Sequence, residues 1–334
     1  MIYRRPWHPV SLTLLGLSLA LHLFTLVLYV RLPNRFAAFT VFPIWVWGLI
    51  GLFVAAISFV CYRGRLSLVV SLIWSFTILI FSDESSSLGR IGQPELQAGK
   101  AKPHARGRVL RVVTLNCARR TDPYEAVAPF QPDIVFLQEI PHTYRLKRFI
   151  DEIYDGKGDY RYNVAKSCAV VVNGTIEFEV SVPKFRCQLL TVKLATGESV
   201  QLMNLHLNGA ATNLRLWERE AWREHRINRE ARQTELTYEM GLLRQKTAYP
   251  RIPALIAGDF NAPANDAVYK LIGKDFTDAF KEVGTGWGNT FHRSLPLLRI
   301  DHLYSSKQLI PIRSRAVRLA GSDHRMVIAD YIFR

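Results

Sequence analysis

The chain has 334 residues, enough for about two domains, and its formal charge of +15 at neutral pH favours an anionic partner. Apolar residues make up 49% of the sequence but are unevenly spread, because no Asp, Glu or Lys occurs before position 83. The four cysteines form no CxxC pair, which excludes a cysteine-bound zinc site. Free buried thiols are expected, and a Cys168–Cys187 disulfide is the alternative in an oxidising compartment.

Three apolar runs within residues 1–82 predict a transmembrane anchor of about three helices: 10–30, 41–62 and 66–81. The first two are long enough to cross a bilayer, which needs about 20 residues. The third run is shorter, so a core or re-entrant helix is its alternative. Residues 83–108 lack an apolar period and predict a linker. The soluble domain then covers residues 109–334.

The arginines of the first 82 residues indicate an orientation for this anchor. With three spans, four of them lie on one side, namely Arg4, Arg5, Arg63 and Arg65. The positive-inside rule then predicts a multi-pass cell-membrane protein with a cytoplasmic amino terminus and an extracytoplasmic soluble domain. If the third run does not span, the orientation of the soluble domain inverts.

The soluble domain alternates strand and helix signals. Strands are predicted at 109–117, 133–140, 160–173, 175–182, 187–194, 199–207, 253–257, 299–304 and 326–333. Helices are predicted at 122–130, 213–245 and 267–272. Asn173-Gly174 is typical of a hairpin turn. Because strands outnumber the interspersed helices, we expect an α/β fold of two packed sheets with helices outside.

The long helical stretch at 213–245 is dense in Arg and Glu and carries Trp217 and Trp222 among arginines. Such a stretch can lie on a membrane surface, clasp nucleic acid, or form an exposed helix with packed tryptophans. The sequence leaves these three interpretations open.

Polar residues gather at the ends of the predicted strands. The short apolar strand 253–257 runs into Gly258-Asp259-Phe260-Asn261, and alternation in an extended chain points Asp259 and Asn261 the same way. Six further polar residues end or interrupt apolar runs: Asn116, Glu139, His206, Asp301, Asp323 and His324. Each alone suits a turn or a structural position, but together they predict phosphoester hydrolysis, which needs neutralised phosphoryl charge and an activated water.

The residue types also suggest roles. Glu139 with Asn116, and with Asp323, would hold Mg²⁺ or Mn²⁺ through oxygen ligands. His324 is a candidate general base, with Asp301 as the acid that orients it through a hydrogen bond to one ring nitrogen. No Ser, Cys or Lys nucleophile motif occurs.

The ordered motifs TLNC, LQE, NLHL, GDFN, RIDHLY and GSDH resemble those of the endonuclease/exonuclease/phosphatase superfamily, which has the DNase I-like fold. The resemblance spans residues 109–334 and implies a four-layer α/β sandwich. It also implies that Asn116 and Glu139 bind the metal with Asp323 beside it, and that His206 and Asn261 contact the phosphate.

The same resemblance implies that Asp259 stabilises the transition state or activates water, and that Asp301 pairs with His324. Which of Asp259 and His324 accepts the proton stays open. A segment before RIDH resembles the substrate-side loop of the superfamily, so Trp287 and Phe291 are expected to line the cleft.

Three functions remain possible. The basic charge and the mixing of aromatics with arginines favour a membrane-anchored, magnesium-dependent phosphodiesterase acting on nucleic acid. The anchor itself favours a phosphoesterase acting on phospholipid headgroups or small molecules, as sphingomyelinases and inositol phosphatases do. The third possibility is a catalytically silent binding domain. No obligate protein partner is evident from the sequence.

Overall fold

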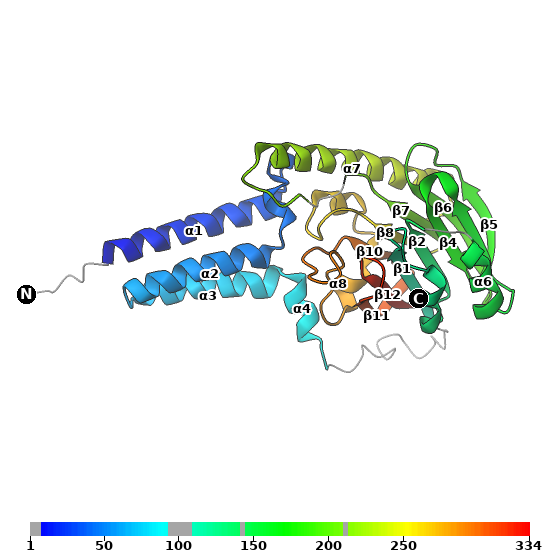
Figure 1. Cartoon of the computed structure of the whole chain (residues 1–334), viewed down its shortest axis with the longest axis horizontal. Helices are drawn as coiled ribbons and strands as arrows, with labels where there is room; N and C mark the ends of the chain where they lie inside the picture. The colour runs from blue at the N-terminus through cyan, green and yellow to red at the C-terminus, as the bar shows by residue number, and fades with distance from the viewer. Residues whose placement is uncertain (1–7, 93–108, 141–143, 210–212) are drawn as a thin grey trace, which may run out of the picture.

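A computed structural model describes residues 8–92, 109–140, 144–209 and 213–334. Three helices at the amino-terminal end of the described chain project from one side of an α/β sandwich (Figure 1). They are α1 (His8–Arg31), α2 (Ile44–Cys61) and α3 (Arg65–Phe81).

The interior of this three-helix bundle is partly polar. The ring Nε2 of His22 and the hydroxyl of Thr77 lie 2.8 Å apart, and the Trp74 indole donates to Ser18 Oγ at 2.9 Å. A Cβ on Gly51 would lie 1.9 Å from the Trp74 ring, so a glycine is needed where α2 and α3 approach. Small residues and interhelical hydrogen bonds are what hold helices together in lipid, where apolar burial gives no driving force.

The outer face of the bundle is apolar. Leu17, Phe53 and Leu72 are each more than 60% exposed on the three helices. The helices α1 and α2 are each long and apolar enough to cross a membrane. The 17-residue α3 continues into α4 (Asp83–Gly89) after a 75° bend, and only this bent pair taken together would count as a third span.

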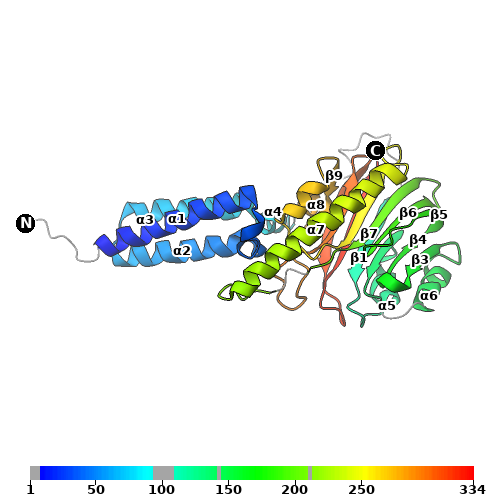
Figure 2. The ribbon, with the colours of Figure 1, turned by 90° about the horizontal axis from the view of Figure 1, so that it is seen from above.

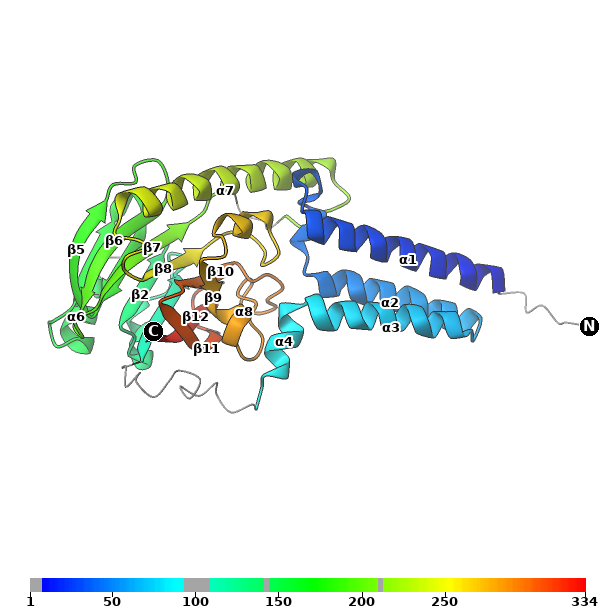
Figure 3. The ribbon, with the colours of Figure 1, turned by 180° about the vertical axis from the view of Figure 1, so that it is seen from behind.

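The predicted linker begins with a helix. Residues 83–89 form α4, because Ser82 caps the helix and Asp83 and Glu84 occupy its first turn, where acids favour helix formation. Residues 93–108 of the predicted linker lie outside the described chain. The views from both sides place α4 between the bundle and the sandwich, near α8 (Ala279–Val283) (Figures 1 and 3).

The sandwich consists of two six-stranded mixed sheets. The first, in spatial order, contains β11 (Leu309–Val317), β12 (Met326–Phe333), β1 (Leu110–Asn116), β2 (Ile134–Gln138), β4 (Cys168–Val172) and β3 (Asp159–Asn163). The second contains β5 (Gly174–Val180), β6 (Cys187–Leu194), β7 (Ser199–His206), β8 (Ala254–Asp259), β10 (Asp301–Ser306) and β9 (Phe276–Asp278). Only the pairs β1–β2 and β7–β8 are parallel, since helical crossovers connect their strands.

Helices cover both outer faces, which gives the predicted four-layer α/β sandwich. The helices α5 (Pro123–Val127) and α6 (Tyr144–Ile153) pack on the first sheet through a core that includes Leu137 and Phe149. The helix α7 (Arg219–Lys246) and the 3₁₀ helix η6 (Ala267–Leu271) pack on the second through a core that includes Leu236 and Met240. A third core, between the sheets, includes Phe136.

One buried amide joins the two sheets. The Asn204 amide nitrogen on β7 donates to the carbonyls of Leu137 and Ala169 at 3.1 and 3.0 Å, and its oxygen accepts from Gln138 at 2.7 Å. These bonds satisfy a fully buried polar side chain and set the position of β7 against β2 and β4.

Two local predictions were wrong. The predicted strand 160–173 is two antiparallel strands, β3 and β4, because the chain reverses around Ser167, which takes a left-handed φ of 51°. Asn173-Gly174 is no hairpin, since β4 belongs to the first sheet and β5 to the second. Gly174 is still required there, because a Cβ would lie 2.2 Å from the Lys193 carbonyl oxygen. The four cysteines are free, so the alternative disulfide is absent.

The helix α7 reaches from the second sheet to the loop that joins α1 and α2 (Figure 2). Arg229, buried on α7, donates to Thr40 of that loop at 2.7 Å and to Asp266 at 2.9 Å. Trp222 packs against Phe36 of the same loop. Trp217, five residues earlier than Trp222, is 81% exposed. The loop and α4 therefore attach the bundle to the sandwich at two places.

Candidate active site

Strand register collects the predicted polar residues at one edge of the sandwich. Asn116 ends β1 beside Gln138 of β2, so Glu139 follows at the same edge. In the second sheet His206 is the register partner of Asp259, and Asp259 is also the partner of Asp301. The sheets thus bring together side chains that lie more than 180 residues apart in the sequence.

Asp259 lies at the centre of this cluster. Its Oδ2 accepts a hydrogen bond from the Asn116 amide at 3.0 Å and lies 3.7 Å from His206 Nε2. Its Oδ1 accepts from the backbone N–H of Asn261 at 2.8 Å. His206 Nε2 also lies 3.7 Å from Glu139 Oε1, so one imidazole faces two carboxylates from different sheets.

The predicted hydrogen bond between His324 and Asp301 is present. Their Nδ1 and Oδ2 atoms are 2.9 Å apart, and the Asp301 side chain is fully buried. The other ring nitrogen of His324 faces Asp259 Oδ2 at 3.9 Å and Asp323 Oδ1 at 4.0 Å. One carboxylate therefore orients His324, and two more lie about 4 Å from its other ring nitrogen.

Burial and neighbouring charges shift the pKa values of the two histidines in opposite directions. Burial lowers the pKa of His206 to about 4, because Arg186, His324 and Arg119 add to the loss of solvation and outweigh Asp259. Burial alone would also lower the pKa of His324, but the charges of Asp301 and Asp259 outweigh it and raise the pKa to about 10. Burial and the Asp301 charge raise the pKa of Asp259.

The predicted metal ligands form an open, oxygen-bearing side of the cluster. The side chains of Glu139 and Asp323 are 32% and 44% exposed, unlike the buried Asp259 and Asp301. Glu139 takes a left-handed φ of 49°, a strained conformation that is concentrated at functional sites. Glu139, Asp323 and the Asn116 amide oxygen, which also accepts from the Ala118 N–H at 2.9 Å, are oxygen donors of the kind that Mg²⁺ and Mn²⁺ prefer.

Another group, Asp259, Asp301 and His324, offers ligand atoms within 4.8 Å of one another. This group fits a metal less well, because the His324 Nδ1 already forms a hydrogen bond to Asp301. A histidine that bridges carboxylates as an imidazolium has no lone pair left for a cation.

The two predicted substrate-side aromatics have different places. Phe291 forms a β-bridge to His324, with ring centroids 5.1 Å apart, so it lies at the site. Trp287 instead donates to the Pro296 carbonyl at 2.9 Å and packs against Trp45 of α2. The expectation that Trp287 lines the cleft therefore has no support from the contacts of this side chain.

Two hydroxyl residues that the sequence motifs contain were not predicted as site residues. Ser322 donates to the Asn116 carbonyl at 2.7 Å and accepts from the His324 N–H at 2.9 Å. The Thr290 hydroxyl accepts from the N–H of Asp301 at 3.2 Å. Ser322 lies in the quoted motif GSDH, and Thr290 lies in the segment before RIDH that resembles the substrate-side loop. These two segments were the available signal.

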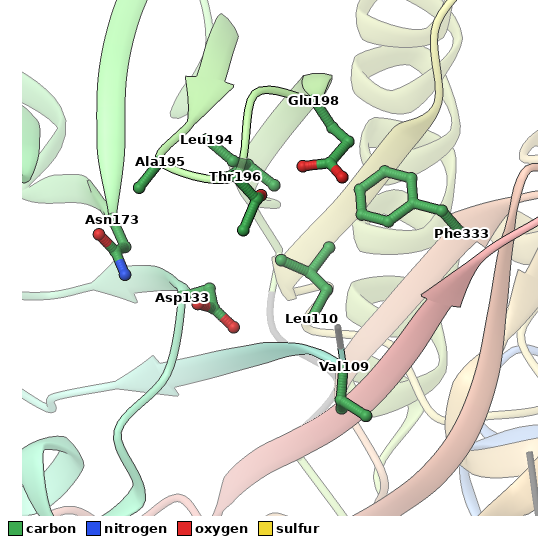
Figure 4. Close-up of a pocket in the computed structure, with 9 residues that line it drawn as sticks. All are labelled: Val109, Leu110, Asp133, Asn173, Leu194, Ala195, Thr196, Glu198 and Phe333. Carbon is green, nitrogen blue, oxygen red and sulfur yellow. The ribbon is translucent and has the colours of Figure 1, made fainter. Parts of the chain in front are cut away.

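A wide groove begins beside the cluster. It has a volume of about 800 Å³ and lies between the segments that follow Asn116 and precede Ser322; its lining includes Arg119, Arg120 and Phe130. A second hollow, of about 10 Å³, lies at the opposite end of the sandwich, around Asp133 and Phe333 (Figure 4). It has room for about one water molecule and lies far from the polar strand ends.

Three solved structures share this fold at low sequence identity. An endonuclease/exonuclease/phosphatase family protein from Bacteroides thetaiotaomicron is 16% identical, with a TM-score of 0.53 over 68% of this chain and 98% of that chain. The mannosyl-6-phosphatase of the same organism is 17% identical, with a TM-score of 0.51 over 67% and 100%. Truncated TDP2 from Caenorhabditis elegans is 20% identical, with a TM-score of 0.50 over 69% and 99%.

No curated protein sequence matches the chain. The sequence profile of the Endonuclease/Exonuclease/phosphatase family matches residues 108–324. This match covers most of the chain and includes every strand that contributes to the polar cluster. The chain belongs to the Endonuclease/Exonuclease/phosphatase family.

Proposed function

We propose that the protein is a membrane-anchored phosphodiesterase that depends on Mg²⁺ or Mn²⁺ and acts on nucleic acid. The observation that carries the hydrolase proposal is the convergence on Asp259, where an amide and two imidazoles lie within 3.9 Å of one carboxylate oxygen. These groups supply the hydrogen-bond donors and the proton acceptor that phosphoester hydrolysis needs in one water-poor place.

The proposed metal ligands are Glu139, Asn116 and Asp323. A divalent cation held by them would neutralise charge on the phosphoryl oxygens. His206 and Asn261 are the proposed phosphate contacts. The Asn261 amide donates one hydrogen bond to the Leu207 carbonyl at 2.8 Å, which holds this side chain in place. Asp259 and His324 are the two candidates for the proton acceptor, and His324 can take this role only in its neutral form, because at its raised pKa both ring nitrogens otherwise carry protons.

The groove supports nucleic acid as the substrate. Its lining includes the exposed Arg119 and Arg120 together with Asp122 and Glu125, and it adjoins the segment that follows Asn116. Arginine contacts to phosphates make binding depend steeply on salt. For duplex DNA, the logarithm of the binding constant falls with the logarithm of the salt concentration with a slope of about 0.9 per contact.

The apolar faces of α1, α2 and α3 support a membrane location. If all three cross the bilayer, the loop between α1 and α2 and the sandwich share one side, and Arg63 and Arg65 lie on the other (Figure 1). The positive-inside rule then places the catalytic domain on the extracytoplasmic side. Trp217, which is 81% exposed and lies two residues before the start of α7 at Arg219, suits the membrane interface.

The test is a substrate panel on the full chain in neutral detergent: duplex and single-stranded DNA, RNA, phospholipid and sugar phosphates, each with Mg²⁺ and with excess chelator. We expect cation-dependent cleavage of nucleic acid. Full activity in chelator would refute the metal, and hydrolysis confined to phospholipid would favour headgroup chemistry, which the membrane location of the domain also suits.

Binding to DNA provides a second measurement for the groove. The double variant Arg119→Ala/Arg120→Ala should lower the salt slope of binding by about 2. Lys193→Ala/Lys307→Ala is the matched control, because both lysines are exposed at the opposite end of the sandwich. Equal slopes in the two variants would contradict a role of the groove in phosphate binding.

A further inference from the structure

We propose that Asp83 and Glu84, at the start of the juxtamembrane helix α4, are positioning residues that hold the His324–Asp301 pair in its working geometry. The proposal rests on the proposed hydrolase function for its kinetic consequence. Its structural basis is a continuous series of hydrogen bonds that begins where α3 leaves the bundle and ends at the two members of the pair.

The first branch of the series runs through Arg299. Asp83 Oδ2 accepts from Arg299 Nη2 at 2.7 Å, and Asp278 Oδ2 accepts from Arg299 Nη1 at the same distance. The Arg299 side chain is only 3% exposed, so its charge depends on these two carboxylates for compensation. Arg299 lies two residues before Asp301, and its guanidinium therefore fixes the path of the chain into β10.

The second branch runs through the loop before β10. Glu84 Oε1 accepts from the buried Asn289 amide at 2.9 Å and from the Trp45 indole of α2 at 3.0 Å. The next residue, Thr290, accepts with its hydroxyl from the N–H groups of Ile300 and Asp301, both at 3.2 Å. Glu84 thus holds Asn289 in place, and the adjacent Thr290 holds the Asp301 backbone.

The same loop also reaches His324. The Thr290 carbonyl accepts from the N–H of Arg325 at 2.9 Å, and Phe291 forms the β-bridge to His324. One loop of three consecutive positions, Asn289 to Phe291, therefore bridges α4, Asp301 and His324. A shift of α4 changes the relative position of the two side chains that form the 2.9 Å hydrogen bond.

Further bonds show that α4 is docked along its length. Arg90, which follows the helix, donates to the Gly284 carbonyl at 2.7 Å, and the Gly286 N–H donates to the Ser87 carbonyl at 3.1 Å. Neither Asp83 nor Glu84 has a described contact with Asp259, Glu139 or Asp323. Their removal should change the geometry of the pair and leave the proposed metal ligands in place.

The experiment compares Asp83→Asn, Glu84→Gln and the double variant with the wild-type full chain in lipid nanodiscs. We expect kcat to fall about tenfold or more in the double variant, equivalent to about 1.4 kcal/mol, with KM and the Mg²⁺ dependence within about twofold. A role limited to stability would lower the amount of folded protein and leave kcat per folded molecule unchanged.

Backbone hydrogen exchange, measured without substrate, provides the independent readout. The amides of residues 290–301 should exchange at least tenfold faster in the double variant, and those of β6 and β7 should not change. Asp151→Asn is the matched control, since Asp151 pairs only with Lys147 on the exposed face of α6 among the described contacts.

Unchanged exchange, unchanged kcat, or a loss confined to KM would each overturn the positioning role. If the wild-type chain hydrolyses no phosphoester, the proposed function fails. The exchange measurement would still decide whether α4 orders the loop, so the two failures are distinguishable.

Discussion

The hydrogen bond between His324 and Asp301 gives the sharpest prediction for catalysis. At 2.9 Å and with an effective dielectric constant of about 20, the Coulomb energy between imidazolium and carboxylate is about 6 kcal/mol, an upper limit for their coupling. Because both side chains are buried, solvent screens this interaction little. We expect His324→Ala and Asp301→Asn each to lower kcat/KM by about 10³-fold, or about 4 kcal/mol.

The double variant should lose little more than either single variant, which gives a coupling energy of about 4 kcal/mol in a double-mutant cycle. The assay is hydrolysis of a chromogenic phosphodiester by the full chain with saturating Mg²⁺. Thermal unfolding of each variant checks that the fold is retained, because Asp301 is left without its partner in His324→Ala. Additive losses, with a coupling energy below about 1 kcal/mol, would refute the idea that the two residues act as a unit.

Three further predictions concern the metal, the topology and acid stability. Glu139→Gln should lower activity by about 10²-fold or more, whereas Glu177→Gln, an exposed control on β5, should not, and equal activities would refute the metal assignment. A reporter fused after Arg334 should report the extracytoplasmic side, and a cytoplasmic signal would mean that α3 with α4 does not span. Burial alone would raise the pKa of Asp278, but Arg299 and His302 outweigh it and hold the pKa well below its ordinary value. A carboxyl group whose pKa is lower in the folded than in the unfolded state stabilises the fold above about pH 4. This stabilisation is lost as the pH falls. Asp278→Asn should therefore flatten the fall of the unfolding temperature between about pH 5 and 3, and identical acid profiles would contradict the ion pair.

The site was predictable where polar residues follow buried strands. Asp259 and Asn261 come after a short apolar run, and Glu139 follows five apolar residues, so alternation and strand length sufficed to group them. The hydrogen bond between Asp301 and His324 was expected because a base needs an acid to orient it and because the family resemblance implies that Asp301 lies at a neighbouring strand end. The grouping of Asp259, Asn261 and Glu139 needed only local patterns and the meeting of strand ends at one edge.

The contacts between anchor and domain were not predictable in this way. The segment beginning at Asp83 has no apolar period, and its helix is stabilised by a cap and by partners 200 residues away, such as Asn289 and Arg299. The Asn173-Gly174 turn failed for a similar reason. A turn signal shows that the chain bends, but the sheet that each flanking strand joins depends on long-range pairing.

The two attachments of the bundle restrict how the sandwich can turn relative to the three helices. Arg229 with Asp266 and Thr40 forms one, and Arg299 with Asp83 forms the other, on separate segments of the anchor. Buried ion pairs add little net stability, yet any arrangement that separates them leaves a buried charge without compensation, at a cost of about 3–5 kcal/mol. A single attachment would allow rotation about one point, whereas two fix the orientation. The candidate site therefore keeps one orientation relative to the bundle.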